Sequence, residues 1–268
     1  MTGGPIGRLE AEILLGHVLA VNRAWLFANP DHAVSPSHEA DFQELIRRRE
    51  YGEPIAYLTG SREFWSLPLR VTPDVLIPRP ETELLVEIAL ALIPIDSAWR
   101  IADLGTGSGA LALAIASERP LCEIHATENS AAALELAREN GRRIAPGRVH
   151  FHQGSWLEPL TGCFQFIVSN PPYVAQDDPH LTEGDCRFEP HGALTPGRDS
   201  MAAIRQIAVD TLHYLEPGGW LAFEHGCEQG KAARELLNGL NYRSVKTWND
   251  LEGRERVTAG QSPDRDRH

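Results

Sequence analysis

A glycine-rich segment in the middle of the chain constrains its fold more than any other feature. Residues 100–104 have the apolar character of a buried strand and run directly into Gly105, Gly107 and Gly109, which precede a helical stretch at 110–117. Glycines allow tight curvature and close approach of a ligand to the backbone. A second predicted strand ends at Glu128, and an acid about 20 residues after such a loop suits the two hydroxyls of a ribose. The G-x-G-x-G spacing does not meet the G-x-G-x-x-G dinucleotide fingerprint, so the segment predicts a nucleoside site of another kind on an α/β sheet.

Strand and helix patterns alternate over most of the chain that follows. We expect strands at 100–104, 122–127, 148–152, 165–169, 220–224, 242–248 and 254–258, and helices at 110–117, 131–140, 201–215 and 228–240. Such alternation implies a parallel sheet that is covered on both faces. The last two strands have no long helix between them, which favours an antiparallel pair at the sheet edge.

The first part of the chain has a different pattern and predicts a separate helical unit. Leu9, Ile13, Leu14 and Val18 recur at helical spacing, and a second helix is expected to end near Glu50. Two short runs at 63–65 and 67–71 then predict a β-hairpin. We expect a helical domain at 1–59, a hairpin linker at 60–80, the α/β domain at 81–260 and a disordered tail at 261–268.

Charge and composition limit the classes of partner. The chain has 25 Lys and Arg against 37 Asp and Glu, a net charge of −12, and an acidic chain argues against tight binding to bare nucleic acid. No run approaches the ~20 apolar residues of a membrane helix, and the N-terminus lacks the apolar region of a signal peptide. The 4 cysteines are scattered, as in a reduced cytoplasmic protein.

The sequence Asn170-Pro171-Pro172-Tyr173 follows the fourth predicted strand, at the edge where open α/β sheets bind ligands. Each proline fixes its own φ angle and pushes the residue before it into an extended conformation, so the corner is stiff. The side-chain oxygen of Asn170 and the carbonyl of Pro171 are two acceptors that suit a planar NH₂ group. Tyr173 suits stacking over the flat group that carries this nitrogen.

This corner resembles the N-P-P-[YF] motif of amino-methyltransferases. An amide or aryl-amine nitrogen is a poor nucleophile because its lone pair is delocalised. Two acceptors orient the nitrogen and stabilise the positive charge that develops on it during attack. The motif occurs in enzymes that methylate adenine N6, guanine N2 and glutamine N5, so it leaves a nucleic-acid substrate and a protein substrate open. A non-enzymatic scaffold that only binds the cofactor is a further alternative, against which the intact loop, acid and corner argue.

Other segments resemble the peptide chain release factor glutamine methyltransferase family, PrmC/HemK. They are RREYGEPIAYLTG at 48–60, EFW at 63–65, LIPRPETE at 76–83, RFEP at 187–190, EHG at 224–226 and ERVT at 255–258. The resemblance implies a class I S-adenosyl-L-methionine-dependent methyltransferase, with a Rossmann-like seven-stranded sheet, an antiparallel edge hairpin and a small N-terminal helical domain that recognises the substrate. It implies methylation of the glutamine N5 in the Gly-Gly-Gln motif of bacterial class I release factors, and we expect a monomer with no direct nucleic-acid partner.

The family's functional residues carry over to matching positions of this chain. The resemblance implies that S-adenosyl-L-methionine is held by Gly105, Thr106, Gly107, Ser108, Gly109, Glu128, Trp156 and Asn170. It implies a glutamine pocket of Asn170, Pro171, Pro172 and Tyr173, with Asn170, Pro171 and Tyr173 as the catalytic residues. Glu128 would bind the ribose and Trp156 would lie against the adenine. The chain departs from the family at Ser155, where an Asp is frequent, and at Glu128, where Asp is commoner.

Three further groups of residues have side chains that could take part in chemistry. Arg79 and Glu81 resemble a loop that closes over the site. His150 and His152 lie one strand step apart, but no carboxylate or cysteine cluster joins them, so no metal site is expected. The pair formed by Glu224 and the following histidine is interpreted as structural.

Overall fold

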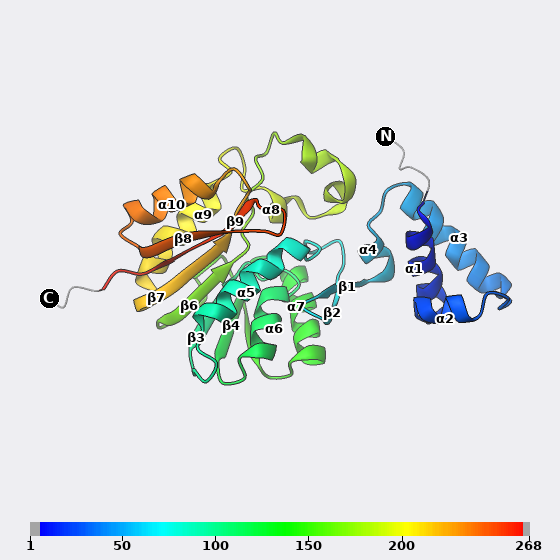
Figure 1. Ribbon diagram of the computed structural model, residues 1–268, viewed down its shortest axis with the longest axis horizontal. Coiled ribbons are helices and arrows are strands. Elements are labelled where there is room, and N and C mark those ends of the chain that lie inside the picture. The colour runs from blue at the N-terminus through cyan, green and yellow to red at the C-terminus, as the bar shows by residue number, and fades with distance from the viewer. Residues whose placement is uncertain (1–5, 265–268) are drawn as a thin grey trace.

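Helices make up the N-terminal part of the molecule in a computed structural model that describes residues 6–264. They are α1 (Arg8–Leu19), α2 (Arg23–Ala28), α3 (Pro36–Glu50) and α4 (Ile55–Thr59). Asn22 and Ser35 cap α2 and α3 because their side chains accept hydrogen bonds from free backbone amides of the first turn. Arg49 on α3 pairs with Glu10 on α1 at 2.6 Å. Figure 1 shows these blue helices beside the sheet-containing part, where they cover neither face of the sheet.

A β-hairpin follows the helical part and packs against the rest of the chain. Strands β1 (Ser61–Phe64) and β2 (Leu67–Arg70) are antiparallel, as the sequence predicts, and positive φ angles at Trp65 and Ser66 form the turn between them. The backbone of Arg70 exchanges two hydrogen bonds with the side chain of Asn140, at 2.8 and 2.9 Å. The hairpin is therefore attached to helix α7 (Ala131–Ile144).

The seven-stranded sheet that the sequence predicts is confirmed. Its strands are β3 (Arg100–Leu104), β4 (Glu123–Glu128), β5 (Val149–Gln153), β6 (Phe164–Ser169), β7 (Leu215–Glu224), β8 (Arg243–Asn249) and β9 (Glu255–Gln261). Their spatial order is β5-β4-β3-β6-β7-β9-β8. Strand β9 runs antiparallel to both of its neighbours, and all the other pairs are parallel. The expected antiparallel edge pair is therefore β8 and β9.

Helices cover both faces of this sheet, as Figure 1 shows. Alternate residues of a strand point to opposite faces, so Ile101 packs in one apolar cluster and Ala102 in another. The first cluster includes α5 (Glu83–Leu92) and α6 (Ala110–Glu118), and the second includes α9 (Ala202–Asp210) and α10 (Gly230–Gly239). Within residues 6–264, no helix is both long enough and apolar enough to cross a lipid bilayer.

The helix predicted at 201–215 is shorter in the structure. Helix α9 ends at Asp210, a 3₁₀ turn follows, and Leu215 is the first residue of β7. The spacing of Leu215 fits the apolar stripe of the predicted helix. Leu215 is instead buried in the sheet, where it pairs with Phe164. The spacing of one apolar residue cannot tell these two destinations apart.

The disordered tail predicted from residue 261 is wrong at its start. Gln261 is the last residue of β9. Ser262 is buried, its N–H donates to the Gly219 carbonyl at 2.8 Å, and its hydroxyl donates to the Glu216 carbonyl at 2.6 Å. These bonds attach the chain to the beginning of β7, whereas residues 265–268 of the expected tail lie outside the described residues.

Candidate active site

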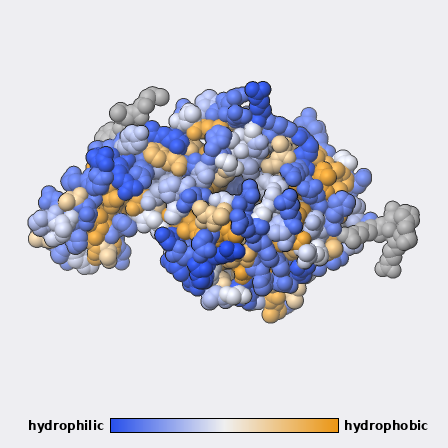
Figure 2. Space-filling view, turned by 180° about the vertical axis from the view of Figure 1, so that it is seen from behind, coloured by the Kyte–Doolittle hydropathy of each residue, from blue (hydrophilic) through white to orange (hydrophobic). Residues whose placement is uncertain are grey.

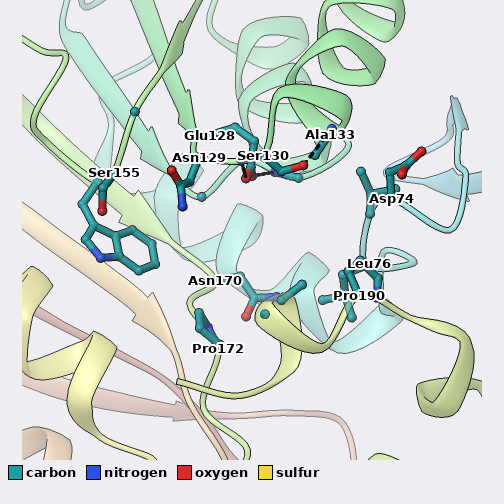
Figure 3. Close-up of a pocket in the computed structure, with 17 residues that line it drawn as sticks. Asp74, Leu76, Glu128, Asn129, Ser130, Ala133, Ser155, Asn170, Pro172 and Pro190 are labelled. Atoms are coloured by element: carbon teal, nitrogen blue, oxygen red, sulfur yellow. Dashed lines mark hydrogen bonds between the residues drawn. The ribbon is translucent and has the colours of Figure 1, made fainter. Parts of the chain in front are cut away.

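A cavity of about 470 Å³ opens at the carboxyl edge of the parallel strands. Its volume lies within the ~300–1,000 Å³ typical of small-molecule sites. It is lined by Asp74, Val75, Leu76, Gly105, Gly107, Glu128, Asn129, Ser130, Ala133, Gly154, Ser155, Trp156, Asn170, Pro172, Pro190, Gly192 and Ala193. Figure 3 shows Glu128, Asn129 and Ser155 along one side of it and Asn170 and Pro172 along the other.

The glycine loop forms part of the cavity floor between β3 and α6. Gly105 and Gly107 have φ angles of +72° and +56°, which L side chains rarely adopt. A Cβ on Gly105 would lie 3.0 Å from the Trp156 ring, so a side chain there would require a shift of the ring in addition to the strained conformation. The backbone amides of Gly105 and Thr106 both donate to the carbonyl of Thr127, which fixes the loop against the end of β4.

Glu128 is the acid predicted at the end of the second strand, and it holds two backbone segments together. Its Oε2 accepts from the N–H of Gly107 and its Oε1 from the N–H of Ser130, both at 2.9 Å. Figure 3 shows Glu128 beside Ser130 at the start of α7. Each carboxylate oxygen has a second acceptor site, so Glu128 could also accept from a pair of hydroxyls.

Trp156 lines the cavity next to Gly105, on a sharp turn after β5, and has a positive φ of 46°. Ser155, which replaces the family's frequent Asp, lines the same cavity. The flat ring of Trp156 suits a nucleobase and the carboxylate of Glu128 suits a ribose. The open glycine loop leaves room for the rest of such a ligand to lie close to the backbone. The residues present therefore fit the nucleoside cofactor that the sequence predicts.

The Asn-Pro-Pro-Tyr corner follows β6 directly. The hydroxyl of Ser169 donates to the carbonyl of Leu104 at 2.7 Å, which ties the end of β6 to the glycine loop. Asn170 and Pro172 line the cavity, whereas Pro171 is buried and Tyr173 does not line it. The amide nitrogen of Asn170 donates to the hydroxyl oxygen of Thr82 at 3.2 Å.

A buried carboxylate lies behind this corner. Glu224, at the end of β7, is 1% exposed and accepts from the hydroxyl of Thr82 at 2.7 Å and from that of Tyr173 at 2.9 Å. Burial raises the pKa of Glu224, although both hydroxyls and Arg256 act in the opposite direction. Burial and the nearby Glu224 raise the pKa of Tyr173, so its hydroxyl remains a donor.

The contacts of Thr82 and Glu224 were not predicted from the sequence. The two residues are 142 positions apart, and no local pattern links them. Glu224 was interpreted as structural together with His225. In the structure His225 faces away, toward the hydroxyl of Thr258 at 2.8 Å.

Some predicted cofactor residues support the loop without lining the cavity. The Thr106 hydroxyl donates to Asp103 at 2.6 Å, and the Ser108 carbonyl accepts from Asn140 at 2.9 Å. Gly109 precedes α6 as its N-cap. These three residues shape the turn, and a direct contact with cofactor stays a prediction for them.

Two segments outside the sheet complete the cavity wall. Asp74–Leu76 come from the hairpin linker, whereas Pro190, Gly192 and Ala193 come from the N-terminal end of the short helix α8 (His191–Leu194). Glu189 joins the two segments, since it pairs with Arg79 and accepts from the N–H of Ile77 at 3.0 Å. Arg79 therefore holds a wall of the site, while Glu81 is exposed and neither residue lines the cavity.

The histidines at 150 and 152 belong to a cluster on the far strands. His125 makes a 3.0 Å contact with His152 and a 2.9 Å contact with Glu123, and its ring lies 5.1 Å from that of His150. Over the described part of the chain, no group of three His, Cys, Asp or Glu side chains has a geometry that could hold a metal ion.

Comparisons with known proteins match both parts of this architecture. The family described as "PrmC N-terminal domain" matches residues 2–60, and the "Methyltransferase small domain" matches residues 81–184. A "Release factor glutamine methyltransferase" of Xylella fastidiosa is 50% identical over 259 residues, which cover 96% of this chain and 94% of that protein. One from Vibrio cholerae is 48% identical over 265 residues, with 97% and 91% covered.

Solved structures at lower identity share the fold. A methyltransferase from Pyrococcus furiosus is 18% identical with a TM-score of 0.55, and covers 85% of this chain and 100% of its own. A Thermus thermophilus 16S rRNA N2 G1207 methyltransferase, solved with AdoMet and guanosine, is 19% identical with a TM-score of 0.56, and covers 75% of this chain and 49% of its own.

Proposed function

Because the chain belongs to the release factor glutamine methyltransferase family, we propose that it transfers a methyl group from S-adenosyl-L-methionine to the side-chain nitrogen N5 of the Gly-Gly-Gln glutamine in class I release factors. One observation carries the proposal, namely that residues suited to a nucleoside and residues suited to an amide share one cavity. Gly105 and Glu128 line it together with Asn170 and Pro172. A methyl donor and a glutamine bound there would lie within one cavity.

The cofactor-binding residues act by holding S-adenosyl-L-methionine in the cavity. Bound S-adenosyl-L-methionine supplies a methyl group on a reactive sulfonium, so a strong base is not required at the start. Glu128 accepts from the ribose hydroxyls with the acceptor sites that its two backbone bonds leave free. Trp156 covers the adenine, and the glycine loop gives the rest of the molecule room to approach the backbone.

The corner residues orient the glutamine. Asn170 Oδ1 and the Pro171 carbonyl accept the two N–H groups of the substrate amide, so its nitrogen faces the methyl group and positive charge develops next to two acceptors. Tyr173 lies outside the cavity lining and its hydroxyl is held by Glu224, so stacking of its ring over the flat carboxamide stays a prediction. The new N–C bond would form as the C–S bond of the donor breaks, with S-adenosyl-L-homocysteine as the leaving group, and water would accept the proton that the product nitrogen then loses.

The helical domain is assigned to recognition of the remaining surface of the release factor. The match of residues 2–60 to the PrmC N-terminal domain and the net charge of −12 support a protein substrate over a nucleic acid. We propose that the enzyme acts as a monomer in the cytoplasm.

Incubation with cofactor that carries a labelled methyl group tests this function. The acceptors are an unmodified release factor, the same factor with Ala in place of the Gly-Gly-Gln glutamine, and unmodified ribosomal RNA and DNA. We expect label only in the first. Label in nucleic acid alone would refute the proposal, and cofactor binding by calorimetry without label in any acceptor would point to a scaffold role.

Asn170→Ala tests the assigned mechanism. Loss of one preorganised acceptor is expected to lower kcat about 10²–10³-fold, while the Kd for the cofactor changes by less than about threefold. Single-turnover methylation and calorimetry measure the two quantities. Asn238→Ala, at an exposed position of α10, should leave both unchanged, and normal turnover in Asn170→Ala would contradict the two-acceptor mechanism.

A further inference from the structure

Four side chains form a continuous hydrogen-bonded chain behind the Asn-Pro-Pro-Tyr corner. Asn170 donates to Thr82 at 3.2 Å, Thr82 donates to Glu224 at 2.7 Å, and Tyr173 donates to the other oxygen of Glu224 at 2.9 Å. Thr82 is 4% exposed and Glu224 is 1% exposed. Neither lines the cavity, so both act on the corner from the side opposite the substrate.

With Glu224 ionised, the number of protons available determines the direction of every bond in this chain. A threonine hydroxyl has one proton, and a Glu224 carboxylate, which only accepts, takes it. The Thr82 oxygen is then left as an acceptor toward Asn170. Only the NH₂ group of the Asn170 amide can face it, because the carbonyl oxygen would place two acceptors against each other. The Asn170 oxygen therefore faces away from Thr82.

We propose that Thr82 and Glu224 are positioning residues that hold the Asn170 amide with its oxygen toward the substrate and hold the Tyr173 ring in place. This inference rests on the proposed function, in which the Asn170 oxygen accepts from the glutamine NH₂. An Asn amide that was free to rotate would present its own NH₂ to the substrate NH₂ part of the time, and a donor cannot bind a donor.

The placement of the two residues supports this role. Thr82 is the last residue of the 3₁₀ turn η1 (Pro80–Thr82), directly before α5, and Glu224 is the last residue of β7. Strand β7 is the parallel neighbour of β6, and Phe223 pairs with Ser169. Glu224, the last residue of β7, and Asn170, the residue after β6, are thus held side by side by the sheet, and Thr82 bridges their side chains.

The charges that face Glu224 come from other elements. Arg256 on β9 lowers the pKa of Glu224, and Glu81 on η1 raises it. Arg256 forms an ion pair with Asp250 at 3.1 Å. Hydroxyl donors are therefore the direct partners of the buried carboxylate, and a buried charge that is held mainly by hydroxyls is poorly explained by stability alone.

Thr82→Val removes the hydroxyl and keeps the shape of the side chain. We expect kcat for release factor methylation to fall at least tenfold, with KM for the release factor and Kd for the cofactor within about threefold of the wild-type values. Thr82→Ser keeps the hydroxyl and should recover kcat to within about threefold of wild type. A kcat for Thr82→Val near the wild-type value, or equal losses in the Val and Ser variants, would overturn the proposal.

A second variant separates orientation from stability. Thr82→Val leaves one oxygen of Glu224 without its donor, and this alone could unfold the protein. Thr82→Val combined with Glu224→Gln removes the unpaired charge and still offers Tyr173 an acceptor. We expect the thermal transition to recover and kcat to stay low. Recovery of kcat together with stability would show a purely structural role and overturn the proposal.

An observation that does not depend on turnover distinguishes this inference from the proposed function. The side-chain NH₂ signal of Asn170, assigned by its absence in Asn170→Ala, can be followed by ¹H–¹⁵N NMR. It should shift and exchange faster with solvent in Thr82→Val but not in Thr82→Ser. An unchanged signal would overturn the positioning role. A changed signal in a protein that methylates no release factor would instead contradict the proposed substrate.

Discussion

Asp103 is a buried residue of this site, and only one of its two carboxylate oxygens has hydrogen-bond donors. It is fully buried beneath the glycine loop, and Oδ2 accepts from the Thr106 hydroxyl at 2.6 Å and from the Ala112 N–H at 3.2 Å. Its Oδ1 has no hydrogen-bond partner among the described residues. Burial raises the pKa of Asp103 to about 7, and the negative charge of Glu128 adds to the effect.

This raised pKa predicts a stability that depends on pH. Between the ordinary pKa of 3.8 and about 7, folded Asp103 retains a proton that the unfolded chain has lost, so folding becomes less favourable as the pH rises through this window. Relative to Asp103→Asn, the wild-type free energy of unfolding should fall by roughly 3 kcal/mol between pH 5 and pH 8. Urea denaturation at both pH values measures it.

The control for this comparison is Asp31→Asn, at an exposed position between α2 and α3. Its free energy of unfolding should follow that of the wild type at both pH values. An equal change with pH in the wild type and in Asp103→Asn would contradict the assignment of the raised pKa to Asp103.

At the scale of elements, the site is a set of strand ends that short turns bring together. The glycine loop leaves β3, Glu128 ends β4 and the proline corner leaves β6. Adjacent parallel strands finish at the same edge, so three separate sequence motifs meet at one cavity. The geometry of the turn at each strand end therefore shapes the cavity as much as the side chains do.

Gly105→Ala tests that requirement. A residue with a Cβ at positive φ is destabilised by about 1–2 kcal/mol wherever it occurs, and at position 105 the Cβ would also press on the Trp156 ring at 3.0 Å. We expect the affinity for S-adenosyl-L-homocysteine to fall at least tenfold by calorimetry. Gly147→Ala, with a φ of +73° and nothing within 4 Å of its Cβ, should lower stability and leave this affinity unchanged. Equal affinities in the two variants would contradict the steric argument.

The elements and motifs of the sheet were largely predictable from the sequence because they depend on local patterns. The strand at 100–104, its loop and the corner at 170–173 carry their own hydrophobic and turn signals, and the structure places them as expected. The bond from Thr82 to Glu224 joins residues 142 positions apart. It depends on strand order and on the path of the linker, which periodicity does not specify.

At the scale of the whole molecule, the helical part meets the rest through a buried apolar cluster that includes Ala56 and Tyr57 of α4, and through a polar and aromatic contact at Arg187. Arg187, on the 3₁₀ turn η3 (Gly184–Phe188), donates to the carbonyl of Tyr51 and lies 5.3 Å from the Tyr51 ring and 4.7 Å from the Phe188 ring. Figure 2 shows the helical part standing out from the larger part, with hydrophobic residues among the hydrophilic ones on its surface. Leu9 and Phe27 are each more than half exposed.

Arg187→Ala should weaken this connection. A cation–π contact at an exposed site contributes about 0.5–1 kcal/mol, so we expect KM for an intact release factor to rise about two- to fivefold. KM for a short Gly-Gly-Gln peptide should not change, because the peptide would contact only the cavity. Arg205→Ala, whose partner Asp199 lies 2.7 Å away in a neighbouring turn, is the matched control. An equal effect on peptide and protein would contradict a role in joining the two parts.

The carboxylate of Glu224 has a consequence for laboratory evolution of this enzyme. A desolvated charge is commonly less stabilising than an apolar side chain of similar volume, so a screen that rewards only survival of heating should favour hydrophobic replacements at this position. The selected variants would gain thermal stability and lose methyltransferase turnover at the same time. Each round of selection therefore has to include a methylation assay, because selection for thermal stability alone would yield inactive variants.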